Sequence, residues 1–153
     1  MAEAHAVQTP PKMPKWMLNA QVFLLRRKLM GPMNKQLMVI TPIGRKSGKR
    51  YSVPIGFIHD GNTILTFNVG GTSNWYKNVL ANPVATLEIE GKTIEARGEP
   101  IKDPQQIAKV YDTYRREQPS MFKRFFGASP DTPTAELMKL GERVVFMRFT
   151  PIK

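Results

Sequence analysis

Residues 44–50, Gly-Arg-Lys-Ser-Gly-Lys-Arg, are the part of the sequence whose residue types most clearly indicate a chemical role. This basic loop holds four cations, two glycines and one hydroxyl, and no acid interrupts it. Guanidinium and ammonium groups form charge-assisted hydrogen bonds with phosphates and carboxylates, and glycines let a backbone turn sharply beside a ligand. The segment therefore predicts an anion-binding loop, and its alternative interpretation is a solvated basic hairpin.

The net charge of +11 is concentrated in the N-terminal third of the chain. Residues 1–59 hold ten Lys or Arg and a single acid, Glu3, whereas the remaining residues hold thirteen cations and eleven acids. This asymmetry indicates an anionic partner, which could be a nucleic acid, a membrane surface or a small ligand rich in phosphate and carboxylate. We do not expect nucleic acid, because the sequence has no recognised binding motif and its aromatic residues are not interleaved with the basic stretch.

Several classes of catalytic site are excluded by composition. The chain has no cysteine, so disulfides and thiolate chemistry are absent. Its two histidines, His5 and His59, are too few for a zinc site or a histidine-based catalytic triad, and we expect no metal. A length of 153 residues is typical of one domain.

The basic loop lies between two strand-like segments, and the same pattern recurs along the chain. Apolar alternation and hairpin signals such as Asp-Gly-Asn at 60–62 predict strands. The expected strands are 36–41, 51–59, 63–69, 84–90, 92–101 and 143–151. Short helices are expected from Ser73 or Thr72 to Leu80, after Asp103, at 119–126, and from Pro133 to Gly141. This order predicts an α+β domain, an antiparallel barrel or sandwich with helices packed outside it.

The N-terminal segment has two expected parts. Residues 1–14 contain three prolines and no periodicity, which indicates a disordered leader before a single domain at 15–153. Residues 15–30 predict a helix with two apolar stripes, Leu18-Val22-Leu25-Leu29 and Trp16-Ala20-Phe23-Met30. Such a helix could pack on the core or rest as an amphipathic helix on an anionic membrane. Its apolar stretch is too short to span a bilayer, so we expect a cytoplasmic protein.

Four motifs in order, "GRKSGKRYSVPIGF", "DGN", "NVGG" and "SNWYKNVLANP", resemble the deazaflavin-dependent nitroreductase family. The resemblance covers about residues 37–101 and extends loosely to the N-terminal helix and the last strand. It implies a split β-barrel related to the FMN-binding, pyridoxamine oxidase-like folds. It also implies coenzyme F-420, a deazaflavin that carries a phosphate, a lactyl group and an oligoglutamate tail and is therefore polyanionic.

The resemblance also implies a set of cofactor-binding residues. The residues expected at the phosphate and tail are Arg45, Lys46 and Ser47, and those expected on the strand under the deazaflavin are Tyr51, Pro54 and Gly56. The residues expected beside the ring edge are Asn68, Val69 and Gly70, and the following helix adds Trp75, Tyr76 and Asn78. Trp75 could equally be a core residue, as aromatic residues on short helices usually are. Some relatives have an arginine at the position of Tyr51 and a lysine at that of Val69, so this chain places less positive charge in the groove.

The activity implied is hydride transfer from the reduced deazaflavin to a small-molecule acceptor, a quinone or a nitroaromatic compound. It needs no dedicated acid or base, so we assign no catalytic residue. Aromatic side chains of the later helices could wall the acceptor pocket or belong to the core: Tyr111, Tyr114, Phe122, Phe125 and Phe126. Alternatives are an FMN-binding oxidoreductase of the same fold and a non-catalytic binder of lipid, haem or another anion. The chain is expected to be a monomer or homodimer.

Overall fold

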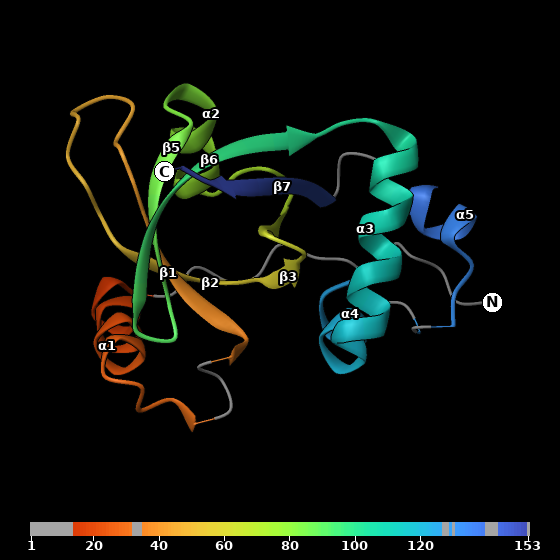
Figure 1. Cartoon of the computed structure of the whole chain (residues 1–153), viewed down its shortest axis with the longest axis horizontal. Coiled ribbons are helices and arrows are strands. Elements are labelled where there is room, and N and C mark those ends of the chain that lie inside the picture. Colours follow the sequence, from red (N-terminus) through yellow and green to blue (C-terminus); the bar gives the residue numbers. More distant parts are fainter. Residues whose placement is uncertain (1–13, 32–34, 127–128, 130, 140–143, 153) are drawn as a thin grey trace.

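A computed structural model describes residues 14–31, 35–126, 129, 131–139 and 144–152. It shows a curled antiparallel sheet with helices packed outside it, as the sequence predicts (Figure 1). The strands are β1 (Leu37–Pro42), β2 (Val53–Gly56), β3 (Ile58–Asp60), β4 (Thr63–Val69), β5 (Val84–Ile89), β6 (Lys92–Ile101) and β7 (Val144–Pro151). The helices are α1 (Lys15–Arg26), α2 (Asn74–Ala81), α3 (Pro104–Glu117), α4 (Pro119–Phe126) and α5 (Thr134–Leu137).

The sheet is a nearly closed barrel because one short segment supplies both of its edges. Its strand order is β2-β1-β5-β6-β7-β4-β3, so residues 53–60 pair with β1 at one end and with β4 at the other. The sequence predicted one continuous strand over 51–59, and this was wrong. The chain bends at Phe57, whose ring is buried and whose N–H donates to the Gln36 carbonyl, and the bend lets the segment change partners.

The barrel and its helices enclose two main apolar clusters. One lies under α2, and the other lies between the sheet and α3, α4 and α5. Tyr111, Tyr114 and Phe122 belong to the second cluster and are each at most 1% exposed, so they are core residues and do not wall an open pocket. Burial raises the pKa of Tyr111 to about 12 and also raises the pKa of Tyr114. The side chains of Phe125 and Phe126 lie outside the described residues.

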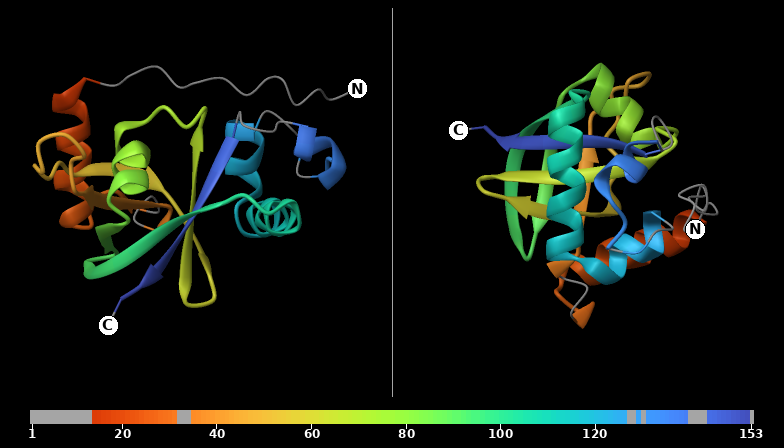
Figure 2. Two further views of the ribbon diagram at one scale, coloured as in Figure 1. Left: turned by 90° about the horizontal axis from the view of Figure 1, so that it is seen from above. Right: turned by 90° about the vertical axis from the view of Figure 1, so that its right-hand side faces the viewer.

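The helices divide into two groups on opposite sides of the barrel. Figure 2 shows α3, α4 and α5 together on one side, and α1, α2 and the loop between β1 and β2 on the other. The predicted start of α3 is confirmed, because Asp103 caps it by accepting a hydrogen bond from the Gln106 N–H at 3.2 Å. The predicted end of the last helix, Gly141, falls outside the described residues.

Helix α1 is attached to the barrel by one apolar stripe and one ion pair. Val22 and Leu25 pack on Val39 of β1. Arg26 donates two hydrogen bonds of 2.9 Å to the carboxylate of Glu88 on β5, a bidentate arrangement that fixes the end of the helix. Within the described residues, no helix is long and apolar enough to cross a bilayer.

The helix ends at Arg26, four residues earlier than the predicted Met30. Lys28 adopts a left-handed conformation with φ of 56°, its N–H donates to Leu25, and the next N–H, of Leu29, donates to Leu24. This pair of hydrogen bonds is a Schellman motif, which satisfies the last carbonyls of a helix and usually has glycine at the left-handed position. Because lysine occupies that position here, the sequence carried no composition signal for the end of the helix. The expected leader at 1–14 lies outside the described residues except for Pro14.

Candidate functional site

The basic loop is a compact turn that is tied to itself by short hydrogen bonds. The Gly44 N–H donates to the Lys49 carbonyl at 2.9 Å, and the Gly48 N–H donates to the Gly44 carbonyl at 3.0 Å. A β-carbon on Gly44 would lie 2.7 Å from the Lys49 carbonyl oxygen, closer than real β-carbon contacts, so this turn requires glycine there. The fold therefore presents the loop's cations on a defined backbone at the end of the β1–β2 hairpin.

Arg45 is held by a residue of another element, Asn78 on α2. The Arg45 N–H and its Nη1 both donate to Asn78 Oδ1, at 3.1 Å and 2.7 Å. Two converging donors require the oxygen of the amide, so the orientation of the Asn78 side chain is determined and its NH₂ group points away from Arg45. The structure thus brings together two of the residues that the resemblance implied, Arg45 and Asn78, as hydrogen-bond partners.

The other side chains of the basic loop are exposed, and among them Arg50 donates a long hydrogen bond of 3.5 Å to the Thr86 hydroxyl on β5. Lys46, Ser47, Lys49 and Arg50 are exposed, and the Ser47 hydroxyl accepts a hydrogen bond from the Lys49 N–H at 3.2 Å. Within the described part of the chain, the N–H groups of Lys46 and Ser47 donate to no protein acceptor. The loop therefore offers charged side chains and two backbone N–H groups to a ligand. Its other N–H groups at 44, 45, 48 and 49 are already bonded within the protein.

Asn68 shapes the turn between β4 and α2. Its Oδ1 accepts from the Ser73 N–H at 3.1 Å, and its Nδ2 donates to the Ser73 hydroxyl at 2.6 Å. Ser73 occupies the N-cap position of α2, but its side chain makes no capping hydrogen bond because it is engaged with Asn68. Gly70, with φ of 77°, lies in the turn that these two residues close.

The remaining predicted cofactor-binding residues differ in exposure. Tyr51 is 59% exposed at the end of the basic loop, with the Lys15 ammonium 5.6 Å from its ring centre. Pro54 and Gly56 lie on β2 and are partly buried. Val69, Trp75 and Tyr76 are buried, so their side chains contribute to the core and little to an open surface.

Sequence reasoning did not foresee a cleft beside α1. It has a volume of about 490 Å³ and lies between the helix and the start of β2. Its lining residues are Asn19, Val22, Phe23, Arg26, Arg27 and Ser52. The helical spacing of Asn19, Phe23 and Arg26 was the available signal, but only the fold shows that Ser52 faces them. The basic loop lies on the same side of the barrel as α1 (Figure 1), the helix whose residues line most of the cleft.

A family model described as F-420H(2)-dependent quinone reductase matches residues 24–133, more than half of the chain. The chain belongs to this family. Membership supports an oxidoreductase that uses the deazaflavin cofactor. The match includes the basic loop, Asn68, Asn78 and all of α3 and α4, so it covers the residues that the motifs pointed to.

Several solved structures are similar to this member of the F-420H(2)-dependent quinone reductase family, and they share its split-barrel fold. HutZ, the heme storage protein from Vibrio cholerae, is 9% identical with a TM-score of 0.56, over 89% of this chain and 91% of that one. A putative pyridoxamine 5'-phosphate oxidase from Listeria innocua is 15% identical with a TM-score of 0.53, over 88% and 93%. An F-420-H2-dependent reductase, FDR-A, is 18% identical with a TM-score of 0.50, over 74% and 94%. At these identities the likeness establishes the fold alone.

Proposed function

We propose that this protein transfers a hydride from reduced coenzyme F-420 to a quinone or nitroaromatic acceptor. The observation that carries the proposal is the Arg45 guanidinium, which Asn78 holds in place on a loop with three further exposed cations. The family match supports the cofactor and the reductase activity. The quinone is the acceptor in the family's description, and both quinones and nitroaromatic compounds are electron-poor, as an acceptor of hydride must be.

The residues present fit a polyanionic cofactor. Arg45 offers a planar guanidinium whose position is set before the ligand arrives, and such preorganisation lowers the entropic cost of binding. Lys46 and Lys49 are free to reach phosphate or carboxylate groups, and two backbone N–H groups of the loop add neutral donors. Glu88, an acid on the nearby sheet face, does not compete for the cations of the loop, because it is paired with Arg26.

The protein's contribution to the reaction is binding, orientation and charge stabilisation. When bound, the deazaflavin supplies a hydride from its ring carbon. The basic loop would anchor the anionic groups, and the turn closed by Asn68 and Ser73 would limit how far the ring can shift. The cleft beside α1 is suited to a planar acceptor, since Phe23 offers a ring face and Asn19 and Arg27 offer donors for developing negative charge on oxygen.

Cofactor dependence is the direct test of this function. We expect the purified protein to reduce a soluble quinone with reduced coenzyme F-420 and to show no turnover with NADPH as the only reductant. The sequence lacks a glycine-rich nicotinamide-nucleotide fingerprint between a strand and a helix. The measurement is acceptor-dependent oxidation of each reductant, and full turnover with NADPH in the absence of added deazaflavin would overturn the proposal.

Asn78 should act on cofactor affinity through Arg45. We expect Asn78→Ala to weaken cofactor binding several-fold, because Arg45 loses the acceptor that holds its guanidinium. In an Arg45→Ala background the same change should have a much smaller effect, since groups that act as a unit are not additive. Isothermal titration of the two single variants and the double variant measures this coupling, with Leu80→Ala on the same helix as the control. Additive losses would show that Asn78 does not act through Arg45.

A further inference from the structure

The outward side of α1 carries an unusual concentration of exposed large apolar side chains. Trp16 is 70% exposed, Phe23 is 52% exposed and Leu29, just after the helix, is 62% exposed. The side of the helix that attaches it to the barrel carries Val22 and Leu25, and Leu29 of the same predicted stripe is exposed because the helix has already ended at Arg26. The barrel therefore covers the side of α1 that carries Val22 and Leu25, and Met30 after the helix also packs there, whereas Trp16 and Phe23 lie on the solvent side.

Cations accompany these apolar side chains. The Arg27 guanidinium lies 4.6 Å from the centre of the Phe23 ring, and Lys15, the first residue of the helix, is exposed with its ammonium 5.6 Å from the centre of the Tyr51 ring. We call these five residues, Lys15, Trp16, Phe23, Arg27 and Leu29, the outer face of α1. Arg26 is not included, because its charge is already paired with Glu88. No acid occurs between Glu3 and Asp60, so the outer face has no acidic neighbour along the chain.

We propose that the outer face of α1 docks on the surface of an anionic lipid membrane. Amphipathic surfaces of this kind bind by burying aromatic and aliphatic side chains at the headgroup boundary while cations meet charged lipid. A second copy of the chain is a poorer occupant, because a two-fold interface would place this face against itself, and the face carries cations and no acid to pair with them. A nucleic acid would gain little from Leu29, which is aliphatic and exposed.

The position of the outer face relates membrane docking to the delivery of the acceptor, and this part of the inference rests on the proposed function. The cleft beside α1 is lined by Phe23 and Arg27, which also belong to the outer face. Docking would therefore bring the cleft to the membrane surface, where an acceptor with a long apolar tail is dissolved. A water-soluble acceptor would not need this arrangement.

The test uses the full chain, without cofactor, and vesicles of phosphatidylcholine with or without phosphatidylglycerol. We expect sedimentation with the phosphatidylglycerol vesicles, little with the neutral ones, and release as salt is raised. The chain has two tryptophans, and Trp75 is buried, so a blue shift of the emission on binding reports Trp16. Equal binding to both kinds of vesicle, or binding with no shift, would overturn the proposal.

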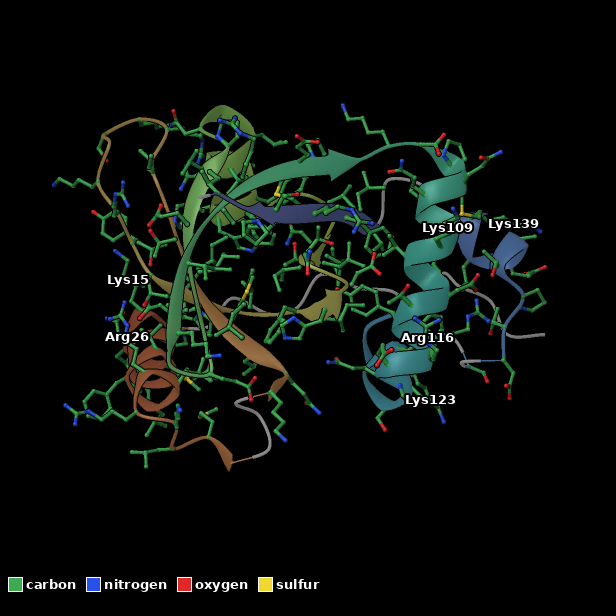
Figure 3. The ribbon with its side chains drawn as sticks, viewed as in Figure 1. Lys15, Arg26, Lys109, Arg116, Lys123 and Lys139 are labelled. Carbon is green, nitrogen blue, oxygen red and sulfur yellow. The ribbon has the colours of Figure 1, made fainter. Side chains whose placement is uncertain are left out.

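Two double variants of the outer face, each with a control double variant, distinguish binding through this face from nonspecific adsorption to vesicles. Trp16→Ser with Phe23→Ser should lower vesicle binding at least tenfold, whereas Leu80→Ser with Ile152→Ser, which removes exposed apolar groups elsewhere, should leave it unchanged. Lys15→Gln with Arg27→Gln should also lower it. The matched control is Lys109→Gln with Lys123→Gln, because Figure 3 shows these lysines on the opposite side of the molecule from Lys15.

The outcomes are distinct. If the apolar variant fails to fold by circular dichroism, the charge pair decides, because both of its changes are at exposed positions. Equal loss in test and control pairs would show a nonspecific charge effect and overturn the proposal. A dimer in sedimentation equilibrium that the Trp16 and Phe23 changes dissociate, without vesicle binding by the wild type, would assign the face to a second copy. Since no cofactor is present, failure of the deazaflavin proposal would leave these results unaffected.

Discussion

Replacing Arg45 and Lys46 together with alanine is expected to weaken binding of reduced coenzyme F-420 by at least tenfold. Under the proposed function, each side chain would make a charged contact with the cofactor's phosphate or carboxylates, since Arg45 is held by Asn78 and Lys46 is exposed beside it. A contact of this kind contributes roughly 1 kcal/mol or more, so two of them exceed the 1.4 kcal/mol that a tenfold change requires. We expect the larger share from Arg45, because Asn78 holds its guanidinium in position, whereas Lys46 must lose its freedom on binding.

The measurement is the dissociation constant by calorimetry at two salt concentrations. Wild-type binding should weaken as salt rises, and the double variant should show a smaller dependence on salt. Lys109→Ala with Lys123→Ala removes the same charge from the far side of the barrel and should change affinity little (Figure 3). An unchanged dissociation constant in a folded Arg45 and Lys46 double variant would show that the basic loop is only a solvated turn.

Gly98→Ala is expected to be the most destabilising single-methyl substitution in the barrel. Gly98 is buried on β6, and an added β-carbon would lie 2.7 Å from Phe149 Cε1 and 2.7 Å from Val79 Cγ1. Both neighbours are fully packed core residues, so the change cannot be absorbed by a flexible side chain. Overpacking of this kind typically costs about 1–3 kcal/mol in the free energy of unfolding.

Urea denaturation measures this cost as a lower midpoint. Gly61→Ala is the control, because Gly61 has open space around it and carries only the strain of its positive φ of 61°. We expect Gly98→Ala to lower the midpoint more than Gly61→Ala. Because Val79 is next to Asn78 on α2, the displaced helix should also loosen the hold on Arg45. A Gly98→Ala protein as stable as the wild type would show that the strand and helix can separate freely.

Local signals predicted most of the elements, and long-range contacts decided the rest. The hairpins at 60–62 and 90–91 were foreseeable because their turn residues act over a few positions, and both turns contain a glycine with positive φ. The bend at Phe57 was not, since the segment changes partners only when the barrel closes. The early end of α1 was hidden because a lysine takes a position where glycine is usual.

The candidate site divides in the same way. The charge of the basic loop was evident from residue types, but the partnership of Arg45 and Asn78 joins positions 33 residues apart and depends on α2 packing beside the β1–β2 hairpin. The roles of Trp75 and Tyr76 could not be decided from the sequence, because an aromatic residue on a short helix fits either a core or a ligand wall. The structure buries both of them.

Parallel calorimetric titrations of the purified protein with coenzyme F-420 and with FMN test the central claim most directly. Both ligands carry a phosphate that the basic loop could hold, but only the deazaflavin carries a carboxylate tail for further cations such as Lys49. We predict that coenzyme F-420 binds at least tenfold more tightly than FMN, and that rising salt reduces the difference. Tighter binding of FMN, or no binding of coenzyme F-420, would contradict the account.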